Sequence, residues 1–421
     1  MVEPGSEPNN TRAKDKPMVL RRVLGVGCMG LIGAEAITIG ALQLASLLRK
    51  ARRDPPGPRT LPAPVQLGAD RLCLHTSGET LYQDMVAAIE GAQESVFLET
   101  FTWKPDTWGQ RFKDAVVSKA RSGVDVYVIY DHFGNLVVPA WFKEFAPEVH
   151  VLAYRGITRP WHALDPRRYT LDHRKLLTVD GHTGFIGGYN LGSLYAEHWS
   201  DTHLRVDGPT AGELADAFAS FWDSHSPPES HIGRRYRRRF NPILHVESTN
   251  ALHLTFPIRD MYVDAIDRAE HHICLCNAYF VPDRTLVEAL TAAARRGVQV
   301  RLLVPWVSNH VVVDWLSRTY FTELLEAGVR VFRYRSMLHA KTCTVDGVWA
   351  TVGTANLDRL SSVGNYEINL EIYSEELARE MERIFEADLR WAEEVDQQGW
   401  AARPWLAKVG ETAVAPLRTF L

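Results

Sequence analysis

The sequence predicts an α/β protein made of two similar halves, each a mixed sheet flanked by helices. Three observations carry this prediction. Strand-like and helix-like stretches alternate from about residue 69 to about residue 396. The same polar positions return 166 residues later in the same order. The 421 residues are 46% hydrophobic and 23% charged, which is typical of a folded chain long enough for two domains. We expect the halves to pack about a pseudo-two-fold axis.

The N-terminal region precedes this repeat. Residues 1–22 are polar and are predicted to be disordered. Residues 23–48 contain Glu35 as their only ionisable side chain, and this run exceeds the roughly 20 residues that span a bilayer. We predict one transmembrane anchor, because a signal peptide has a shorter apolar core of about 7–15 residues. Basic residues on both sides argue against a buried soluble helix. They are equally frequent on the two sides, so the positive-inside rule does not predict the orientation.

Composition places the other boundaries. Residues 49–68 contain many prolines and are predicted to be a semi-rigid linker. The remaining segments are the first half (69–226), a basic linker (227–245), the second half (246–396) and a C-terminal tail (397–421).

The two halves begin with the same order of elements. In the first half we predict a strand at Ser95–Phe101, a helix at Trp108–Ser122 that ends at Gly123, and a strand at Val124–Tyr130. In the second half the matching elements are His272–Phe280, Arg284–Arg296 ending at Gly297, and Val298–Val304. A strand, a helix and a second strand in this order predict a sheet covered by helices.

The repeat also carries polar side chains. The first copy contains His173, Lys175, Asp180, Gly187, Gly188, Asn190 and Asp201. The second contains His339, Lys341, Asp346, Gly353, Thr354, Asn356 and Glu367. The offset is constant, since 339 − 173 and 367 − 201 are both 166. Each half therefore supplies one histidine, one lysine, one asparagine and one acid.

The pattern H-x-K-x4-D followed by G-G/S-x-N, present twice, resembles the paired signature of the phospholipase D superfamily. Three flanking segments are similar to those of bacterial cardiolipin synthases in particular: Glu99–Phe101, Ala278–Pro282 and Asn356–Arg359. The resemblance covers about residues 70–395. The sequence departs from the usual pattern at Thr354, where the motif usually has Ser or Gly. Threonine retains the hydroxyl group that serine would supply.

Two imidazoles, two ammonium groups and two amides around one point suit a phosphodiester. In a strand, the histidine and lysine of each motif would share one face. The resemblance implies that His173 attacks phosphorus and that His339 acts as acid and base, an assignment that near-symmetry leaves reversible. Lys175 and Lys341 would stabilise charge. The acids Asp201 and Glu367 would orient the imidazoles. We expect Asn190, Asn356, Gly188 and Thr354 to bind substrate, and Asp180 and Asp346 to brace the motif.

The implied reaction is transfer of a phosphatidyl group from phosphatidylglycerol to a second phospholipid at a bacterial membrane. Hydrolysis by the same residues, or a membrane-tethered nuclease, are the alternatives. The basic stretches 159–169 and 234–239 would suit nucleic acid or anionic lipid. The predicted membrane span favours lipid, so we expect no nucleic-acid partner. One chain supplies both motifs, so we expect no obligate protein partner. No paired Cys/His spacing is present, so we predict no metal and no cofactor.

Overall fold

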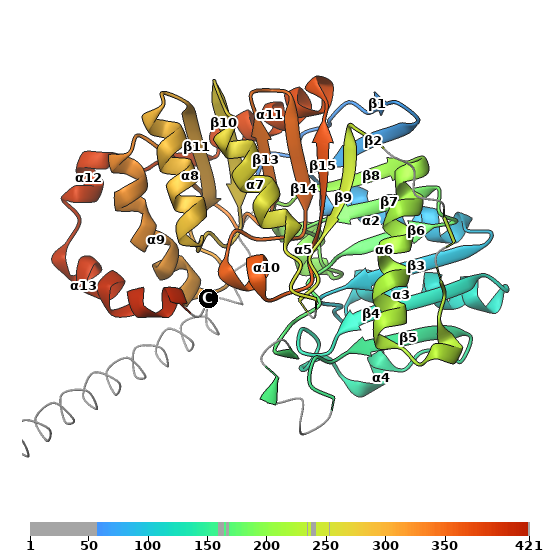
Figure 1. Ribbon diagram of the computed structural model, residues 1–421. Coiled ribbons are helices and arrows are strands. Elements are labelled where there is room, and N and C mark those ends of the chain that lie inside the picture. The colour runs from blue at the N-terminus through green and yellow to red at the C-terminus, as the bar shows by residue number, and fades with distance from the viewer. Residues whose placement is uncertain are drawn as a thin grey trace, which may run out of the picture.

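The computed structural model describes residues 57–158, 164–165, 168–233, 235–236, 241–251 and 253–419. Two eight-stranded sheets lie side by side with helices packed on them, the first half on the right of Figure 1 and the second on the left. The predicted disordered terminus (1–22) and membrane anchor (23–48) lie outside the described residues. Within the part of the chain that is described, no helix is long and apolar enough to cross a bilayer.

The first sheet has the order β1-β2-β8-β7-β6-β3-β4-β5. Its strands are β1 (Val65–Leu67), β2 (Asp70–His75), β3 (Ser95–Thr100), β4 (Asp125–Asp131), β5 (Val149–Tyr154), β6 (Leu176–Val179), β7 (Thr183–Gly187) and β8 (His203–Asp207). Its helices are α2 (Gly78–Gly91), α3 (Thr107–Arg121), α4 (Ala140–Lys143), α5 (Ser193–His198) and α6 (Pro209–His225), and the 3-10 turn η3 (Pro228–Ser230) follows.

The second sheet has the order β16-β12-β11-β10-β13-β14-β15-β9. Its strands are β9 (Leu244–Ser248), β10 (His272–Asn277), β11 (Gln299–Pro305), β12 (Arg330–Tyr334), β13 (Lys341–Val345), β14 (Trp349–Gly353), β15 (Ile368–Tyr373) and β16 (Ala392–Glu394). Its helices are α7 (Pro257–Asp267), α8 (Arg284–Arg295), α9 (Val311–Glu326), α10 (Arg359–Val363), α11 (Glu375–Leu389), α12 (Gln397–Ala401) and α13 (Trp405–Val414), followed by η4 (Ala415–Thr419).

The same six-strand unit occurs in both sheets. The order β5-β4-β3-β6-β7-β8 in the first matches β12-β11-β10-β13-β14-β15 in the second. In each unit the first three strands are parallel and the next ones pair antiparallel. The prediction of two similar mixed sheets with flanking helices is confirmed.

Local chemistry explains where the repeated helices begin and end. The side chains of Asp106 and Asp283 accept hydrogen bonds from the backbone N–H groups of the first turns of α3 and α8. Gly123 and Gly297 follow these helices in the left-handed region, with φ values of 93° and 96°, which side chains with a Cβ rarely adopt. These positions therefore stop each helix and return the chain to the sheet.

The two halves share one hydrophobic core. A single cluster of buried side chains includes Ile186 and Leu204 from the first sheet and Val352 and Leu370 from the second. The helices α6 and α11 contribute to the same cluster. The halves are therefore packed as one body, and burial of this shared apolar surface favours their association.

The C-terminal tail packs on the second half. The helix α13 lies along α9, and Arg403 pairs with Glu411 at 2.7 Å. The indole of Trp400 lies 5.4 Å from the ring of Phe321, and Val414 joins the core of this half. The tail is thus part of the folded second half.

Candidate active site

A cavity of about 710 Å³ opens between the two halves. His173, His339, Asn190 and Asn356 all line it, although they come from sequence positions up to 183 residues apart. The repeated polar residues therefore meet at one place, as a shared active site requires. The basic stretches 159–163, 166–167 and 237–240, and Arg234, lie outside the described residues.

Each histidine is held by the acid of the other half. The Nδ1 atom of His173 lies 2.9 and 3.1 Å from the two carboxylate oxygens of Glu367. The Nδ1 atom of His339 lies 2.6 Å from a carboxylate oxygen of Asp201. Because Nδ1 of each ring is used in this way, Nε2 is the nitrogen left for chemistry in the cavity.

The backbone of each motif is also bound to the other half. The N–H of His173 donates to the carbonyl of Tyr366 at 3.0 Å, and the N–H of His339 donates to the carbonyl of Ser200 at 2.7 Å. Strands β6 and β13 begin only at Leu176 and Lys341. Both histidines therefore lie just before these strands, and both use their backbone for contacts across the interface.

The motif lysines lie beneath the histidines. The ammonium group of Lys175 donates to the carbonyl of His173 at 2.5 Å, and that of Lys341 donates to the carbonyl of His339. Both are buried, and neither is among the residues that line the cavity. They therefore support the histidines from behind and supply positive charge below the reacting centre.

Burial disfavours charge throughout this group. It lowers the pKa of Lys175 to about 7 and that of Lys341 to about 8, against the opposing effect of the nearby acids. It raises the pKa of Asp201 to about 6 and that of Glu367 to about 8. Burial and the two ammonium groups hold the pKa values of both histidines well below their usual range. A bound phosphodiester anion would raise the pKa values of both lysines and so favour their protonated forms.

The acids inside the motifs, Asp180 and Asp346, form no hydrogen bond or ion pair with the motif histidines His173 and His339. Asp180 accepts hydrogen bonds of 2.8 Å from the backbone N–H groups of residues 93–95, and Asp346 does the same for residues 270–272. Both residues adopt left-handed φ values, 51° and 52°. They tie the turn after β6 or β13 to the start of the neighbouring strand.

The four residues expected to bind substrate fall into two groups. Asn190 and Asn356 line the cavity. Gly188 and Thr354 do not: a Cβ on Gly188 would lie 2.2 Å from a carboxylate oxygen of Asp201, and the Thr354 hydroxyl donates to Glu367 at 2.5 Å. The structure thus places Gly188 and Thr354 behind the histidine–acid pairs, where they position the acids.

A buried charged cluster, which the repeated motifs do not indicate, lies behind His173. Arg174 forms ion pairs with Glu99 and with Asp172, and all three side chains are buried. The signal that could have found it is the position of charged residues in otherwise apolar strand segments. The cluster fixes the chain on both sides of His173.

Aromatic rings pack against both imidazoles. The ring of Phe101 lies 5.0 Å from His173, and that of Trp199 lies 5.0 Å from His339. The ring of Tyr279 lies 5.9 Å from His339 and the same distance from the ammonium of Lys341. Trp199 and Tyr279 both line the cavity.

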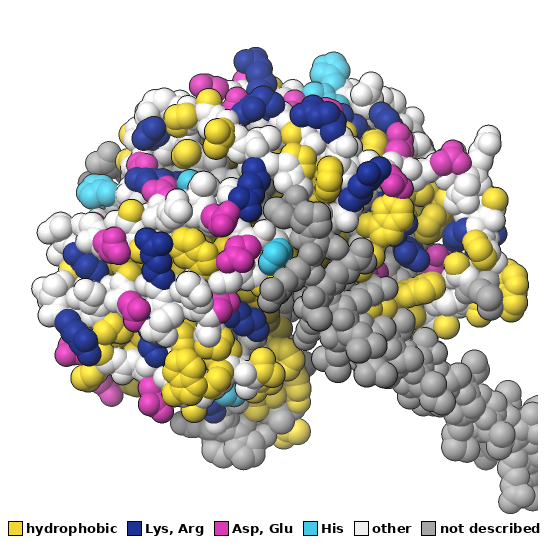
Figure 2. Space-filling view, turned by 180° about the vertical axis from the view of Figure 1, so that it is seen from behind, with side chains coloured by type: hydrophobic (Ala, Val, Ile, Leu, Met, Phe, Trp, Pro, Cys, Tyr) yellow, Lys and Arg dark blue, Asp and Glu magenta, His cyan; other side chains and the backbone are white. Residues whose placement is uncertain are grey.

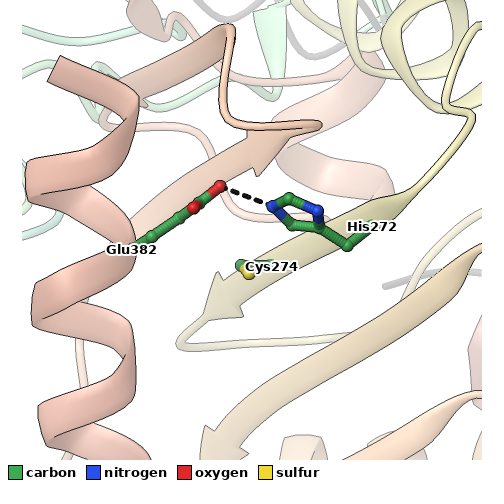
Figure 3. A group of neighbouring side chains, drawn as sticks. All are labelled: His272, Cys274 and Glu382. Carbon is green, nitrogen blue, oxygen red and sulfur yellow. Dashed lines mark hydrogen bonds and ion pairs between the residues drawn. The ribbon is translucent and has the colours of Figure 1, made fainter. Parts of the chain in front are cut away.

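Two groups of described residues have the donor types of a metal site. His245, Glu247 and Glu371 form one, and His272, Cys274 and Glu382 form the other, which is drawn in Figure 3. In the second group His272 bonds Glu382 at 2.8 Å, while the sulfur of Cys274 accepts from the Arg301 guanidinium at 3.0 Å. A guanidinium beside the sulfur opposes a bound cation, and neither group lines the cavity.

Comparisons with known proteins agree with this geometry. The family model described as "Cardiolipin synthase, PLD-like domain" matches residues 85–222 and 262–389, one match in each half. The cardiolipin synthase of Geobacillus kaustophilus is 32% identical over 366 residues, which cover 83% of this chain and 72% of that protein. The major cardiolipin synthase of Bacillus subtilis is 30% identical over 353 residues, covering 80% of this chain and 72% of that protein.

The fold has a counterpart among solved structures. The phosphatidylserine synthase of Haemophilus influenzae superposes with a TM-score of 0.64 over 86% of this chain and 94% of that chain, at 16% sequence identity. At this identity the likeness concerns the fold alone. The family match in both halves carries the assignment: this chain belongs to the PLD-like cardiolipin synthase family.

Proposed function

We propose that this chain is a phosphatidyltransferase that moves the phosphatidyl group of phosphatidylglycerol to the hydroxyl of a second phospholipid, forming cardiolipin and releasing glycerol. The observation that carries the proposal is the crosswise pairing of His173 with Glu367 and of His339 with Asp201 at one cavity. Membership of the cardiolipin synthase family supports the same reaction.

The first step forms a covalent intermediate. Nε2 of His173 attacks phosphorus while the bond from phosphorus to the glycerol oxygen breaks, and His339 gives its proton to that oxygen. Asp201 is the stronger of the two buried acids, with a pKa of about 6, and it supports the charged form of His339. Glu367 holds the neutral imidazole of His173 with Nε2 toward the cavity.

The second step reverses the proton transfer. His339 removes the proton from the acceptor hydroxyl, the oxygen bonds to phosphorus, and the bond from phosphorus to His173 breaks. The charges of the buried lysines and acids oppose one another in this site, so a bound phosphodiester monoanion favours protonation of one histidine. One protonated and one neutral histidine is the state that the first step needs.

The walls of the cavity favour a lipid over a nucleic acid. Phe133, Leu136 and Val137 line one side, and Val307 and Met337 are among the residues of the other half. Lys104 is the one Lys or Arg among the described lining residues. A nucleic-acid groove needs several cations to track the phosphate backbone. Apolar walls also limit access of water to a phosphohistidine, which favours transfer over hydrolysis.

We also propose that residues 23–48 anchor the chain in the bacterial cell membrane. Their apolar length supports this. Two lipid substrates would then be met by lateral diffusion.

A product analysis tests the function. The full chain in mixed micelles would receive phosphatidylglycerol labelled in its glycerol headgroup and, separately, in its acyl chains. We expect free glycerol and cardiolipin from the native protein and neither from His173→Ala. The control is His245→Ala, which removes a histidine paired with a glutamate outside the cavity. Phosphatidic acid in place of cardiolipin would show that water is the acceptor and would contradict the transferase proposal.

A further inference from the structure

The segment that follows β4 exposes large apolar side chains. Phe133, Leu136, Val137 and Trp141 are 62%, 56%, 84% and 60% exposed, although they lie within nine residues of one another. Scattered exposed apolar residues are normal, but a contiguous group indicates a contact surface. Figure 2 shows hydrophobic side chains gathered on the lower part of the first half, over the region where Figure 1 places α4.

This segment is held in place by buried contacts. The Asn135 side chain accepts from the N–H of Trp103 at 2.8 Å and donates to the carbonyls of Phe101 and Asp131 at 2.8 and 2.7 Å. Val138 and Phe142, which directly follow the exposed Val137 and Trp141, are buried. The fold therefore directs the apolar side chains outward, and their exposure is not a consequence of local disorder.

The exposed residues lie at the mouth of the catalytic cavity. Phe133, Leu136 and Val137 line it on the side of the first half, and Leu360, which is 39% exposed, lines it on the side of the second. We call these four residues and Trp141 the apolar rim. A ligand that enters or leaves the cavity would pass this rim.

Basic side chains lie directly beside the rim. The ammonium of Lys113 donates to the carbonyl of Phe142 at 2.6 Å, and that of Lys143 donates to the carbonyl of Asn135 at 3.3 Å. Arg155 is exposed, and its charge and that of Lys143 add to burial in lowering the pKa of His132. Apolar side chains with basic residues behind them match the acyl and headgroup layers of an anionic bilayer.

The start of the described chain lies close to the same cavity. The N–H of Gly57 donates to the hydroxyl of Ser200 at 3.1 Å, next to Trp199 in the cavity wall. The predicted anchor ends at residue 48, so eight residues (49–56) lie between it and Gly57, a reach of 57 − 48 = 9 residue steps. A fully extended chain of this length spans about 30 Å. An anchor in the bilayer would thus keep the cavity within this distance of it.

We propose that the apolar rim inserts into the surface of an anionic phospholipid bilayer, so that the cavity opens onto lipid and not onto water. This proposal rests on the proposed phosphatidyltransferase function and names the partner surface of the same site. Donor and acceptor then reach the histidines without their acyl chains crossing water. Trp141 lies where an aromatic side chain at a membrane interface is expected, with an apolar body and a polar edge.

Depth-dependent quenching tests the insertion. A fluorophore would be attached to Val137→Cys in the full chain carrying Cys28→Ser and Cys73→Ser, reconstituted in phosphatidylglycerol vesicles with brominated acyl chains. The matched probe is Val348→Cys, which is 46% exposed in the turn between β13 and β14, at the end of β13 away from Lys341. We expect at least about twofold quenching at 137 and none at 348, because bromine quenches only within the acyl layer. Equal quenching at the two positions would overturn the proposal.

Turnover provides the second measurement. Trp141 does not line the cavity. We expect Trp141→Asp to lower turnover of phosphatidylglycerol in vesicles about tenfold or more, because an apolar contact is replaced by a charge at an anionic surface. Turnover of a short-chain, monomeric phosphatidylglycerol should be unchanged, and Val348→Asp should change neither. Equal loss on both substrates would overturn the proposal. Quenching does not depend on product, so a chain that inserts but makes no cardiolipin would contradict only the proposed function.

Discussion

Replacing Asp201 or Glu367 should impair different halves of the reaction, because each acid holds a different histidine. We predict that Asp201→Asn slows proton transfer by His339, while Glu367→Gln slows attack by His173 on phosphorus. Both contacts are buried, at 2.6 Å for Asp201 and 2.9 Å for Glu367. An amide can still form a hydrogen bond, but it lacks the charge and can favour the wrong tautomer of the imidazole.

The structure sets the expected size of these effects. A hydrogen bond to a charged group contributes about 1.5–3 kcal/mol, more where both partners are buried. At about 1.4 kcal/mol per factor of ten, this corresponds to a loss of about 10- to 150-fold in Asp201→Asn, and to the lower end of this range in Glu367→Gln because burial raises the pKa of Glu367 to about 8. Burial raises the pKa of Asp201 only to about 6, so it is ionised at pH 7 and its loss should act in full on protonated His339.

The assay compares two leaving groups. Phosphatidylglycerol needs a proton on its departing alcohol, whereas a phosphatidyl ester of p-nitrophenol releases a stable anion without one. With the nitrophenyl ester, the first-turnover burst of nitrophenol from Asp201→Asn should return to within a few-fold of the native rate, whereas later turnovers stay slow because the second step still needs His339 as a base. Glu367→Gln should remain slow with both substrates. The control is Glu371→Gln, which alters an acid paired with His245 outside the cavity.

The opposite pattern would refute this assignment. If the nitrophenyl ester restored Glu367→Gln and not Asp201→Asn, His339 would be the nucleophile. If it restored both variants equally, the two histidine–acid pairs would not divide the chemistry as we propose.

Three further predictions follow from the same site. Burial lowers the pKa values of the two motif lysines to about 7 and about 8, so kcat/KM should fall as pH rises through this range and the lysines lose their charge. The fall in kcat should occur only at higher pH, because bound phosphodiester raises the pKa values of both lysines. Coincident pH profiles of kcat and kcat/KM would contradict this prediction. Gly188→Ala should lower activity about 10-fold or more by displacing the Asp201 carboxylate, whereas Gly91→Ala, which meets no atom within 4 Å, should leave it unchanged. Asp180→Ala should reduce the free energy of unfolding by about 2–4 kcal/mol in chemical denaturation, because three N–H groups lose their acceptor and alanine disfavours the φ of 51° at this position. Asp180→Asn should reduce it less, because asparagine tolerates this φ. Equal losses in the two variants would argue against a contribution from backbone strain.

Much of the fold could be predicted because local signals mark it. The predicted helix at Trp108–Ser122 is found as Thr107–Arg121, and the predicted strand at Ser95–Phe101 as Ser95–Thr100. Alternation and the terminal glycine are properties of neighbouring residues, so the sequence contains them directly. The strand predicted at His272–Phe280 ends earlier, at Asn277, because the next residues turn into the cavity.

The pairing within the site could not be predicted in the same way. The spacing of 28 residues relates Asp201 to His173 and Glu367 to His339 along the chain. In the structure each acid contacts the other histidine, because the interface between the sheets and not the chain order decides which side chains meet. The position of Thr354 behind Glu367 depends on the same interface. The sequence therefore indicated which residues form the site, but not which acid contacts which histidine.

The crosswise contacts have a consequence for the origin of the chain. A half taken alone would keep its histidine and lysine but would lack the acid that orients that histidine, and its motif backbone would lose the partner that it finds at Tyr366 or Ser200. A single-motif ancestor with this geometry would have needed a second copy of itself to form either pair. Fusion of two copies would have made that association permanent. It also would have freed the two copies to diverge, so that Asp201 and Glu367 could come to serve a nucleophile and a proton donor separately.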